Sequence, residues 1–257
     1  MKMTQNTILV TGGGSGIGRA LAESFHALGN KVIIAGRQKQ RLEETIDVNP
    51  GMHFRILDQS NASRICDFAR QLMVDFPDLN ALVNNAGIQH MEDLTSGVVA
   101  EAEATVMTDL LGPIRLTAAL LPFLMRKAQS TVLNVSSSLA FVPMAVIPTY
   151  CASKAAMHSY TQSLRYQLRK TSVQVIEIIP PGVQTGLRGD RTMDPDAMPL
   201  DEFIAEAMSI LKKSPDATEV VVERAKLRRF AEANGGYDAF FIRLNEQVAA
   251  GQEKGAR

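Results

Sequence analysis

The chain has 257 residues, of which 46% are hydrophobic and 21% charged, and its formal net charge at pH 7 is zero. This composition is typical of a folded globular protein. The balanced charge gives no electrostatic reason to expect nucleic acid or an anionic membrane as a partner. No signal-peptide segment precedes the first strand, and no uninterrupted apolar run reaches the ~18 residues that span a bilayer. We therefore expect a cytoplasmic protein that does not bind membranes.

The cysteine content predicts neither a disulfide framework nor a metal site. The two cysteines, Cys66 and Cys151, are far apart in the sequence and form no CxxC motif. We expect both to be reduced thiols, with Cys151 in a packing role.

The N-terminal segment predicts a βαβ unit with a glycine-rich turn. Apolar strands are expected at Thr7–Thr11 and Lys31–Ala35, with an apolar-periodic helix between them that closes at Gly29. Glycines at this place let backbone N–H groups approach a pyrophosphate at the helix N-terminus, although flexible loops share the same composition. The candidate phosphate-binding residues are Gly12, Gly14, Ser15, Gly16, Ile17 and Gly18.

The end of the second strand predicts which dinucleotide the chain prefers. Arg37 follows this strand, Lys39 and Arg41 lie close behind, and no acidic residue appears before Glu43. An arginine here suits the 2′-phosphate of NADP, whereas an acidic residue would suit the ribose hydroxyl of NAD. We expect NADP, with NAD possible; the alternative is a solvated basic helix start.

The remaining elements alternate strand and helix. Further strands are expected at Met52–Leu57, Asn80–Asn84, Thr131–Val135 and Val173–Ile179. Helices are expected over residues 99–126, with irregularities at Pro113 and Pro122, and over residues 149–170. This order predicts an α/β fold: a Rossmann-like doubly wound parallel sheet of six or seven strands with helices on both faces. A ligand should bind at the carboxyl ends of the strands, where Asp58 would meet the adenine.

A serine cluster and a Tyr–Lys pair follow the fifth strand. Three serines, residues 136–138, stand at its end, and Tyr150 and Lys154 lie four apart (154 − 150) on one helical face. A free phenol has a pKa near ~10, and a neighbouring ammonium lowers it toward values useful in acid–base catalysis. The alternative is a chance pair at helical spacing.

The C-terminal part of the chain is expected to complete one domain spanning residues 1–257. Residues 183–200 are predicted to form a substrate lid, because this Pro- and Gly-rich segment is too long for an ordinary connection. Amphipathic helices follow within residues 201–250, at Asp201–Lys213 and Thr218–Ala233. The basic cluster in the second of them is expected to be a solvated face: Arg224, Lys226, Arg228 and Arg229.

These motifs together resemble the short-chain dehydrogenase/reductase family. The resemblance rests on Thr11–Gly18, on Asn84–Gly87, and on Tyr150-x-x-x-Lys154 with Ser137 thirteen residues earlier (150 − 137), and covers residues 5–190. Within the family the chain is most similar to single-domain bacterial oxidoreductases of the Dlt-operon type. The resemblance implies a nicotinamide cofactor and hydride transfer between C4 of its ring and a carbonyl or alcohol carbon.

The resemblance also implies roles for individual residues. Tyr150 would be the general acid–base, Lys154 would lower its pKa and bind the nicotinamide ribose, and Ser137 would orient the substrate oxygen. The adenine ribose and the nicotinamide amide would be bound by Asn85, Ala86, Gly87, Val183 and Thr185.

Asp109 departs from the family pattern. It stands twenty-eight residues before Ser137 (137 − 28), where the family has an asparagine whose carbonyl supports a proton relay to the lysine. An aspartate keeps the carbonyl, but it either adds a negative charge near Lys154 or stays protonated. We expect a weakened relay. The alternative is a nucleotide-binding regulatory or scaffold protein.

Two further features concern assembly and substrate. Asn234–Gly236 stands where the family has the end of a C-terminal strand, so the sequence leaves open whether a seventh strand and the usual tetramer contacts are present. The fourth and fifth helices have apolar stripes that a second copy could bury, and a homodimer or homotetramer is therefore expected. The apolar run Leu139–Ile147, with Gln89, His90 and Met91 beside it, predicts an uncharged, hydrophobic carbonyl or alcohol; core packing is the alternative. Arg188 and Arg191 could instead attract an anion or be solvated.

Overall fold

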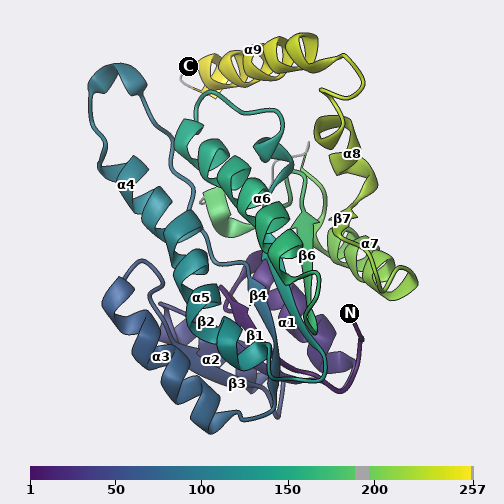
Figure 1. Ribbon diagram of the computed structural model, residues 1–257. Coiled ribbons are helices and arrows are strands. Elements are labelled where there is room, and N and C mark those ends of the chain that lie inside the picture. The colour runs from purple at the N-terminus through teal and green to yellow at the C-terminus, as the bar shows by residue number, and fades with distance from the viewer. Residues whose placement is uncertain (189–196, 256–257) are drawn as a thin grey trace.

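A seven-stranded parallel sheet forms the centre of the computed structural model, which describes residues 1–188 and 197–255 (Figure 1). Its strand order is β3-β2-β1-β4-β5-β6-β7. The strands are β1 Thr7–Thr11, β2 Lys31–Gly36, β3 His53–Ile56, β4 Leu79–Asn84, β5 Ser130–Val135, β6 Val173–Ile179 and β7 Glu219–Val221. The predicted Rossmann-like α/β class is confirmed, with seven strands among the described residues. The order reverses between β1 and β4, which is where such sheets bind ligands.

Helices cover both faces of the sheet and divide the core into two clusters. One cluster packs the sheet against α1 (Gly16–Ala27), α2 (Lys39–Asp47) and α7 (Leu200–Lys213). The other packs it against α3 (Ala62–Asp75), α5 (Gly112–Leu124) and α6 (Pro148–Leu168). The central strands β1 and β5 are buried along their whole length because both faces are covered.

The long helix expected over residues 99–126 is continuous but changes its winding. It consists of α4 (Ala100–Val106), a π-helical turn η2 (Met107–Leu111) and α5. The irregularity arises immediately before Pro113, which cannot donate a main-chain hydrogen bond. By length and composition, Ala100–Leu124 is the one helix in the described ranges that could cross a membrane. Core helices meet the same criteria, and Leu116, for example, is fully buried in the core.

The predicted helix at Thr218–Ala233 is wrong. Its first residues form β7, which pairs with β6, and only Glu223–Arg229 is helical (α8). Three consecutive valines at 220–222 explain the difference, because β-branched residues suit a strand and the sheet edge buries Val220 and Val222 completely. The seventh strand left open by the sequence is therefore present.

The C-terminal helix α9 (Tyr237–Gly255) packs beside the start of α6 (Figure 1). A third apolar cluster joins Leu244 of α9 to Val142, Met144 and Tyr150. Most of the apolar run 139–147 thus packs into a core, which favours the alternative considered for it. Residues 189–196 of the predicted lid and Arg191 lie outside the described residues. The flanking segments are joined by a bridge between Val183 and Met198.

Replacing Phe203 of α7 by alanine tests the packing of α7 against the sheet. This side chain is fully buried in the same cluster as Phe25 of α1. We expect Phe203→Ala to lower the free energy of unfolding by about 3–5 kcal/mol, measured by urea denaturation. Val74→Ala is the control, since Val74 is exposed and its change should stay within about 0.5 kcal/mol. Equal losses in the two variants would contradict the assignment.

Candidate functional site

A cavity of about 620 Å³ opens at the carboxyl ends of the strands. It brings together residues from the glycine-rich turn, the ends of β2, β4 and β5, the start of α6 and the segment after β6. The predicted site residues that line it are Gly12, Gly14, Ser15, Gly16, Ile17, Arg37, Asp58, Asn85, Ala86, Gly87, Ser137, Tyr150, Lys154, Val183 and Thr185. Segments far apart in the sequence therefore meet at one place. Two predicted residues, Gly18 and Asp109, do not line the cavity.

The glycine-rich turn is shaped by close backbone approach. Gly12 has φ +69°, in the left-handed region that favours glycine. Gly18 lies behind the turn, where a Cβ atom would stand 2.3 Å from Nδ2 of Asn85 and 2.4 Å from the carbonyl oxygen of Gly12. Gly18 thus has a packing role at the base of the turn, whereas the other residues predicted for the turn line the cavity.

The N-terminus of α1 offers donors to an anionic ligand. Ser15 is the N-cap residue, but its side chain makes no capping hydrogen bond. The first N–H groups of a helix have no intrahelical acceptor and carry favourable partial positive charge. Since Ser15, Gly16 and Ile17 line the cavity, this end fits a phosphate group.

Thr11 fastens the glycine-rich turn to the end of β4. Its hydroxyl accepts hydrogen bonds from the backbone N–H groups of Asn85 (3.0 Å) and Ala86 (3.1 Å) and donates one to the carbonyl of Val83 (3.3 Å). The side chain of Asn85 in turn donates to the carbonyl of Thr11 (2.9 Å). Sequence reasoning did not assign this role to Thr11, although a threonine at a strand end is a visible signal.

The far end of the cavity is basic. Arg37 and Arg41 line it, and Asp58 is the one acidic side chain among the described lining residues. The carboxylate of Asp58 accepts hydrogen bonds from the N–H and hydroxyl groups of Ser60, at 3.0 and 2.6 Å. An anionic substituent at this end would therefore meet guanidinium groups.

Ser137, Tyr150 and Lys154 converge at the opposite end. Ser137 follows β5; its hydroxyl accepts a hydrogen bond from the N–H of Leu139 (3.1 Å) and lies close enough to the Tyr150 phenol to lower the pKa of that phenol. The ammonium of Lys154 donates to the carbonyl of Val135 (3.2 Å) and lies 5.4 Å from the centre of the Tyr150 ring. The spacing in α6 thus places phenol and ammonium on one face, as the sequence predicts.

The electrostatics of Tyr150 differ from the simple expectation. Burial raises the pKa of its phenol above the ordinary value, and this effect outweighs the downward pull of the Lys154 ammonium. The carboxylate of Asp109 also raises the pKa of Tyr150, whereas the hydrogen bond from Ser137 lowers it. The phenol is therefore held in its protonated form.

Asp109 lies beneath the cavity, within the π-helical turn. Its Oδ1 accepts the N–H of Ile88 (2.8 Å), and its Oδ2 is 3.6 Å from Nζ of Lys154. Burial raises the pKa of this carboxyl, and Lys154 partly offsets the increase. Gln59, a residue not singled out from the sequence, supports the turn by donating to the carbonyl of Thr108 (2.7 Å).

The rim of the cavity differs from the expectation in two respects. Leu139, Gln89 and His90 line it, but Met91 is exposed and is not among the lining residues. Arg228 of α8 lines the cavity and donates to the hydroxyl of Ser138 (3.4 Å), so the basic cluster is not entirely a solvated face.

Comparisons with known proteins agree with this geometry. The short chain dehydrogenase family profile matches residues 6–196. The uncharacterized oxidoreductase DltE of Bacillus subtilis (strain 168) is 38% identical over 96% of this chain and 99% of its own. A short chain dehydrogenase from Burkholderia cenocepacia J2315, solved in complex with NADP, is 25% identical over 95% of this chain and 99% of its own, with a TM-score of 0.80. One from Burkholderia phymatum, solved with NAD, is similar in fold, with a TM-score of 0.77, 20% identity and coverage of 91% and 95%.

The parallel sheet, the glycine-rich turn and the cavity at the strand ends define a Rossmann-like α/β protein. The chain belongs to the short-chain dehydrogenase/reductase family of oxidoreductases.

The raised pKa of Asp109 predicts a pH-dependent effect of Asp109→Asn on stability. Burial holds the folded-state pKa above the ~3.9 of an unfolded aspartate, so the folded state keeps a proton that the unfolded state releases. This carboxyl therefore lowers the free energy of unfolding as pH rises above ~4 through the folded-state pKa. We expect the stability of Asp109→Asn, relative to the unmodified protein, to improve over that range in urea unfolding.

Asp75→Asn is the control with the opposite sign. The hydrogen bond from Arg55 lowers the pKa of Asp75, so its contribution to stability is present above the unfolded pKa and is lost as pH falls through the folded pKa. Relative to the unmodified protein, this variant should become less stable as pH rises. A difference for Asp109→Asn that stays constant with pH would contradict the burial argument.

Proposed function

We propose that the protein is an NADP-dependent oxidoreductase that transfers a hydride between the nicotinamide and a carbonyl or secondary alcohol. The observation that carries this proposal is the convergence of Ser137, Tyr150 and Lys154 at one end of a cavity whose other end is the glycine-rich turn. Gly12, Gly14, Ser15, Gly16 and Ile17 would hold the pyrophosphate in this arrangement, with Gly18 supporting the turn. Asp58, Asn85, Ala86 and Gly87 would meet the adenosine, and Val183 and Thr185 the nicotinamide amide.

The cofactor supplies or accepts the hydride, and the side chains of the chain handle the proton. In the reducing direction Tyr150 donates its phenolic proton to the substrate oxygen, which Ser137 holds by a hydrogen bond. Lys154 would stabilise the phenolate that remains and bind the hydroxyl groups of the nicotinamide ribose. A phenol that burial keeps protonated can serve as the acid in this step.

Asp109 modulates this proton transfer. Its carboxyl lies 3.6 Å from the Lys154 ammonium and, when ionised, offsets the pull of that ammonium on the phenol. The relay is thereby weakened but retained. The same observation favours a second candidate function, a nucleotide-binding regulatory or scaffold protein with little turnover.

The basic end of the cavity supports NADP over NAD. Arg37 and Arg41 lie where a 2′-phosphate would enter, without an acidic partner for a free ribose hydroxyl at the end of β2. The relative from Burkholderia cenocepacia was solved with NADP, and the one from Burkholderia phymatum with NAD.

Arg37→Ala tests the cofactor preference. Loss of a charge-assisted hydrogen bond costs about 1.5–3 kcal/mol, so the Kd for NADPH should rise roughly 10- to 100-fold. The Kd for NADH should stay within about twofold, because NADH has no 2′-phosphate. Fluorescence titration measures both constants. Lys39→Ala is the matched control, since Lys39 pairs with Glu43 outside the cavity. Tighter binding of NADH than NADPH by the unmodified protein would refute the preference.

The substrate proposed is a small carbonyl or alcohol with a hydrophobic, uncharged body. Leu139, Leu187 and Ala197 supply apolar lining to the cavity.

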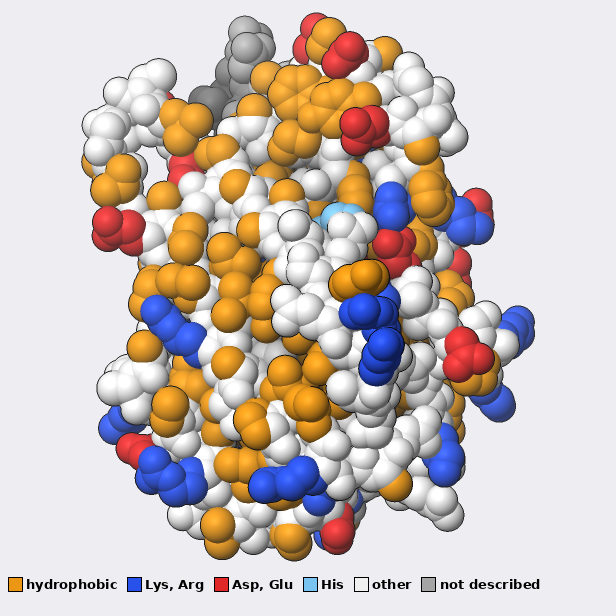
Figure 2. All heavy atoms as spheres, viewed as in Figure 1, with side chains coloured by type: hydrophobic (Ala, Val, Ile, Leu, Met, Phe, Trp, Pro, Cys, Tyr) orange, Lys and Arg blue, Asp and Glu red, His pale blue; other side chains and the backbone are white. Residues whose placement is uncertain are grey.

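We also propose that the protein acts in the cytoplasm as a homodimer or homotetramer. Both cysteines are free thiols, in keeping with a reducing compartment. Figure 2 shows hydrophobic side chains spread over the face that α5 and α6 present, and such a face can pair with a second copy.

Tyr150→Phe separates the two candidate functions. If Tyr150 is the acid, its loss should lower kcat by about 10²- to 10⁴-fold on any carbonyl that the unmodified protein reduces with NADPH. The Kd for NADPH should stay unchanged, because the ring is retained. A spectrophotometric panel of aldehydes and ketones, following NADPH absorbance, provides the assay. NADPH binding by the unmodified protein without turnover on any carbonyl would instead favour the regulatory candidate.

A further inference from the structure

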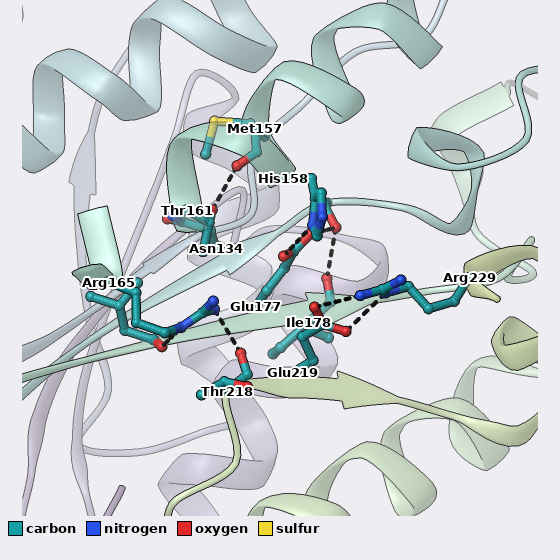
Figure 3. Close-up of polar contacts among 12 residues, drawn as sticks. Asn134, Met157, His158, Thr161, Arg165, Glu177, Ile178, Thr218, Glu219 and Arg229 are labelled. Carbon is teal, nitrogen blue, oxygen red and sulfur yellow. Dashed lines mark hydrogen bonds and ion pairs between the residues drawn. The ribbon is translucent and has the colours of Figure 1, made fainter. Parts of the chain in front are cut away.

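A network of polar contacts surrounds Glu177, between β6, β7, α6 and α8 (Figure 3). We call Ser136, His158, Glu177, Glu219 and Arg229 the Glu177 network. Its centre is Glu177 on β6, whose side chain is completely buried in the interior of the protein. A buried carboxylate is costly unless donors satisfy it, so its partners indicate why it is tolerated here.

Both carboxylate oxygens of Glu177 have partners. The hydroxyl of Ser136 donates to Oε1 at 2.5 Å, and Nδ1 of His158 lies 2.8 Å from Oε2. The two partners belong to different elements: Ser136 directly follows β5, and His158 is on α6. One side chain therefore connects the end of β5 to α6.

These two elements carry the reacting side chains of the proposed function. Ser136 immediately precedes Ser137, and His158 lies one helical turn beyond Lys154 (158 − 154 = 4) and two turns beyond Tyr150. The face of α6 that presents the phenol and the ammonium to the cavity thus continues to Glu177. The carboxylate links the strand end that carries Ser137 to the helix that carries Tyr150.

The main chain alone does not make this link. The pairing of β5 with β6 ends at Val135, and beyond it the N–H groups of Ser136 and Ser138 donate sideways to the carbonyls of Ile178 and Pro180 on the neighbouring strand segment. Those bonds run within the sheet. The contact of Glu177 with His158 acts between the sheet and α6, which is the direction separating Ser137 from Tyr150.

A metal ion is the other interpretation of this cluster. His158, Glu177 and Glu219 offer ligand atoms within 4.8 Å of one another. Arg229, however, donates from Nε and Nη2 to the two carboxylate oxygens of Glu219, at 2.8 and 2.9 Å. With Ser136 and His158 on Glu177, each oxygen of both carboxylates already has a donor or a ring nitrogen beside it. The chemistry is that of a closed hydrogen-bond network.

Aromatic packing encloses the network on its outer side. The guanidinium of Arg229 lies 4.5 Å from the ring centre of Phe141, and that ring meets His158 edge-on at 4.7 Å. Phe141 belongs to the segment that follows the three serines. The imidazole is therefore fixed both by the carboxylate and by an aromatic ring, so its orientation is well determined.

We propose that Glu177 is a positioning residue for catalysis, which sets the separation between the Ser137 hydroxyl and the Tyr150 phenol by holding Ser136 and His158 together. This inference rests on the proposed function, because it assigns a purpose to the Ser137–Tyr150 distance. Misplacement of a reacting group by about 1 Å can cost about 10²-fold in rate. Glu177 touches neither substrate nor cofactor in this role.

A double-mutant cycle tests the proposal. Glu177→Leu, Ser137→Ala and the combined variant are assayed for kcat and KM on a ketone that the unmodified protein reduces with NADPH, at a temperature well below every unfolding midpoint. Glu177→Leu should lower kcat at least about 10-fold with the Kd for NADPH unchanged. In the Ser137→Ala background it should cause little further loss, because residues that act as one unit are not additive.

Two variants separate positioning from general stability. Glu177→Gln keeps the shape and can hydrogen-bond both neighbours, so it should restore most of kcat. Thr161→Val removes another bond between α6 and β5, from Asn134 to Thr161 (2.9 Å), about one turn farther from the site. It should lower the unfolding midpoint while leaving kcat nearly unchanged. If Glu177→Leu does not fold, Ser136→Ala replaces it in the same cycle.

Each outcome is decisive. Fully additive losses for Glu177→Leu and Ser137→Ala, or a change confined to KM, would overturn the positioning role. A comparable loss of kcat in Thr161→Val would also overturn it, because any loosening of α6 would then suffice. An unchanged kcat in both Ser137→Ala and Tyr150→Phe would instead remove the proposed catalytic mechanism itself, and the two failures are therefore distinguishable.

Discussion

The arrangement of this site depends on an ammonium group buried where the sheet meets a helix. The side chain of Lys154 is only 6% exposed, so its charge must be compensated within the protein. The carbonyl at the end of β5 and the carboxyl of Asp109 provide that compensation. The end of β5 supplies the carbonyl, the π-helical turn supplies the carboxyl and α6 carries the ammonium. The relative positions of these three elements therefore determine how well the Lys154 charge is stabilised. Lys154 also lines the cavity, so this stabilised charge lies at its wall.

Two buried carboxyl groups flank α6 and act on different properties. Asp109 is near the ammonium and affects the proton affinity of the phenol, so its influence is electrostatic. Glu177, on β6, contacts α6 one turn beyond Lys154, and its proposed influence on the position of the phenol relative to the serine is geometric. Both carboxyl groups lie in a poorly solvated interior, where an ionised carboxyl is costly unless hydrogen bonds or an opposite charge compensate it.

The sequence predicted those parts of the protein that depend on local periodicity and on parallel-sheet geometry. The strands and the meeting of Arg37, Asn85, Ser137 and Tyr150 at one cavity follow from motifs that each end a strand. The helix expected at 218–233 failed because three valines can serve either a helix face or a strand, and only the free edge of β6 decides between them. The pKa of Tyr150 could not be read from the spacing to Lys154, since burial is a tertiary property. The Glu177 network was missed for the same reason.

Part of the cavity lining comes from residues that the family profile does not match. The family profile ends at residue 196, yet Arg228 lines the cavity and Leu244 packs in the cluster that includes Tyr150. The C-terminal segment beyond the matched residues therefore borders the cavity, while the residues proposed for proton transfer, Ser137, Tyr150 and Lys154, lie within the matched region. Exchanging α8 and α9 between homologues would accordingly replace side chains beside the cavity and leave those three residues in place. The two helices at the end of the chain thus contribute to the surroundings of Tyr150 although they lie outside the matched region.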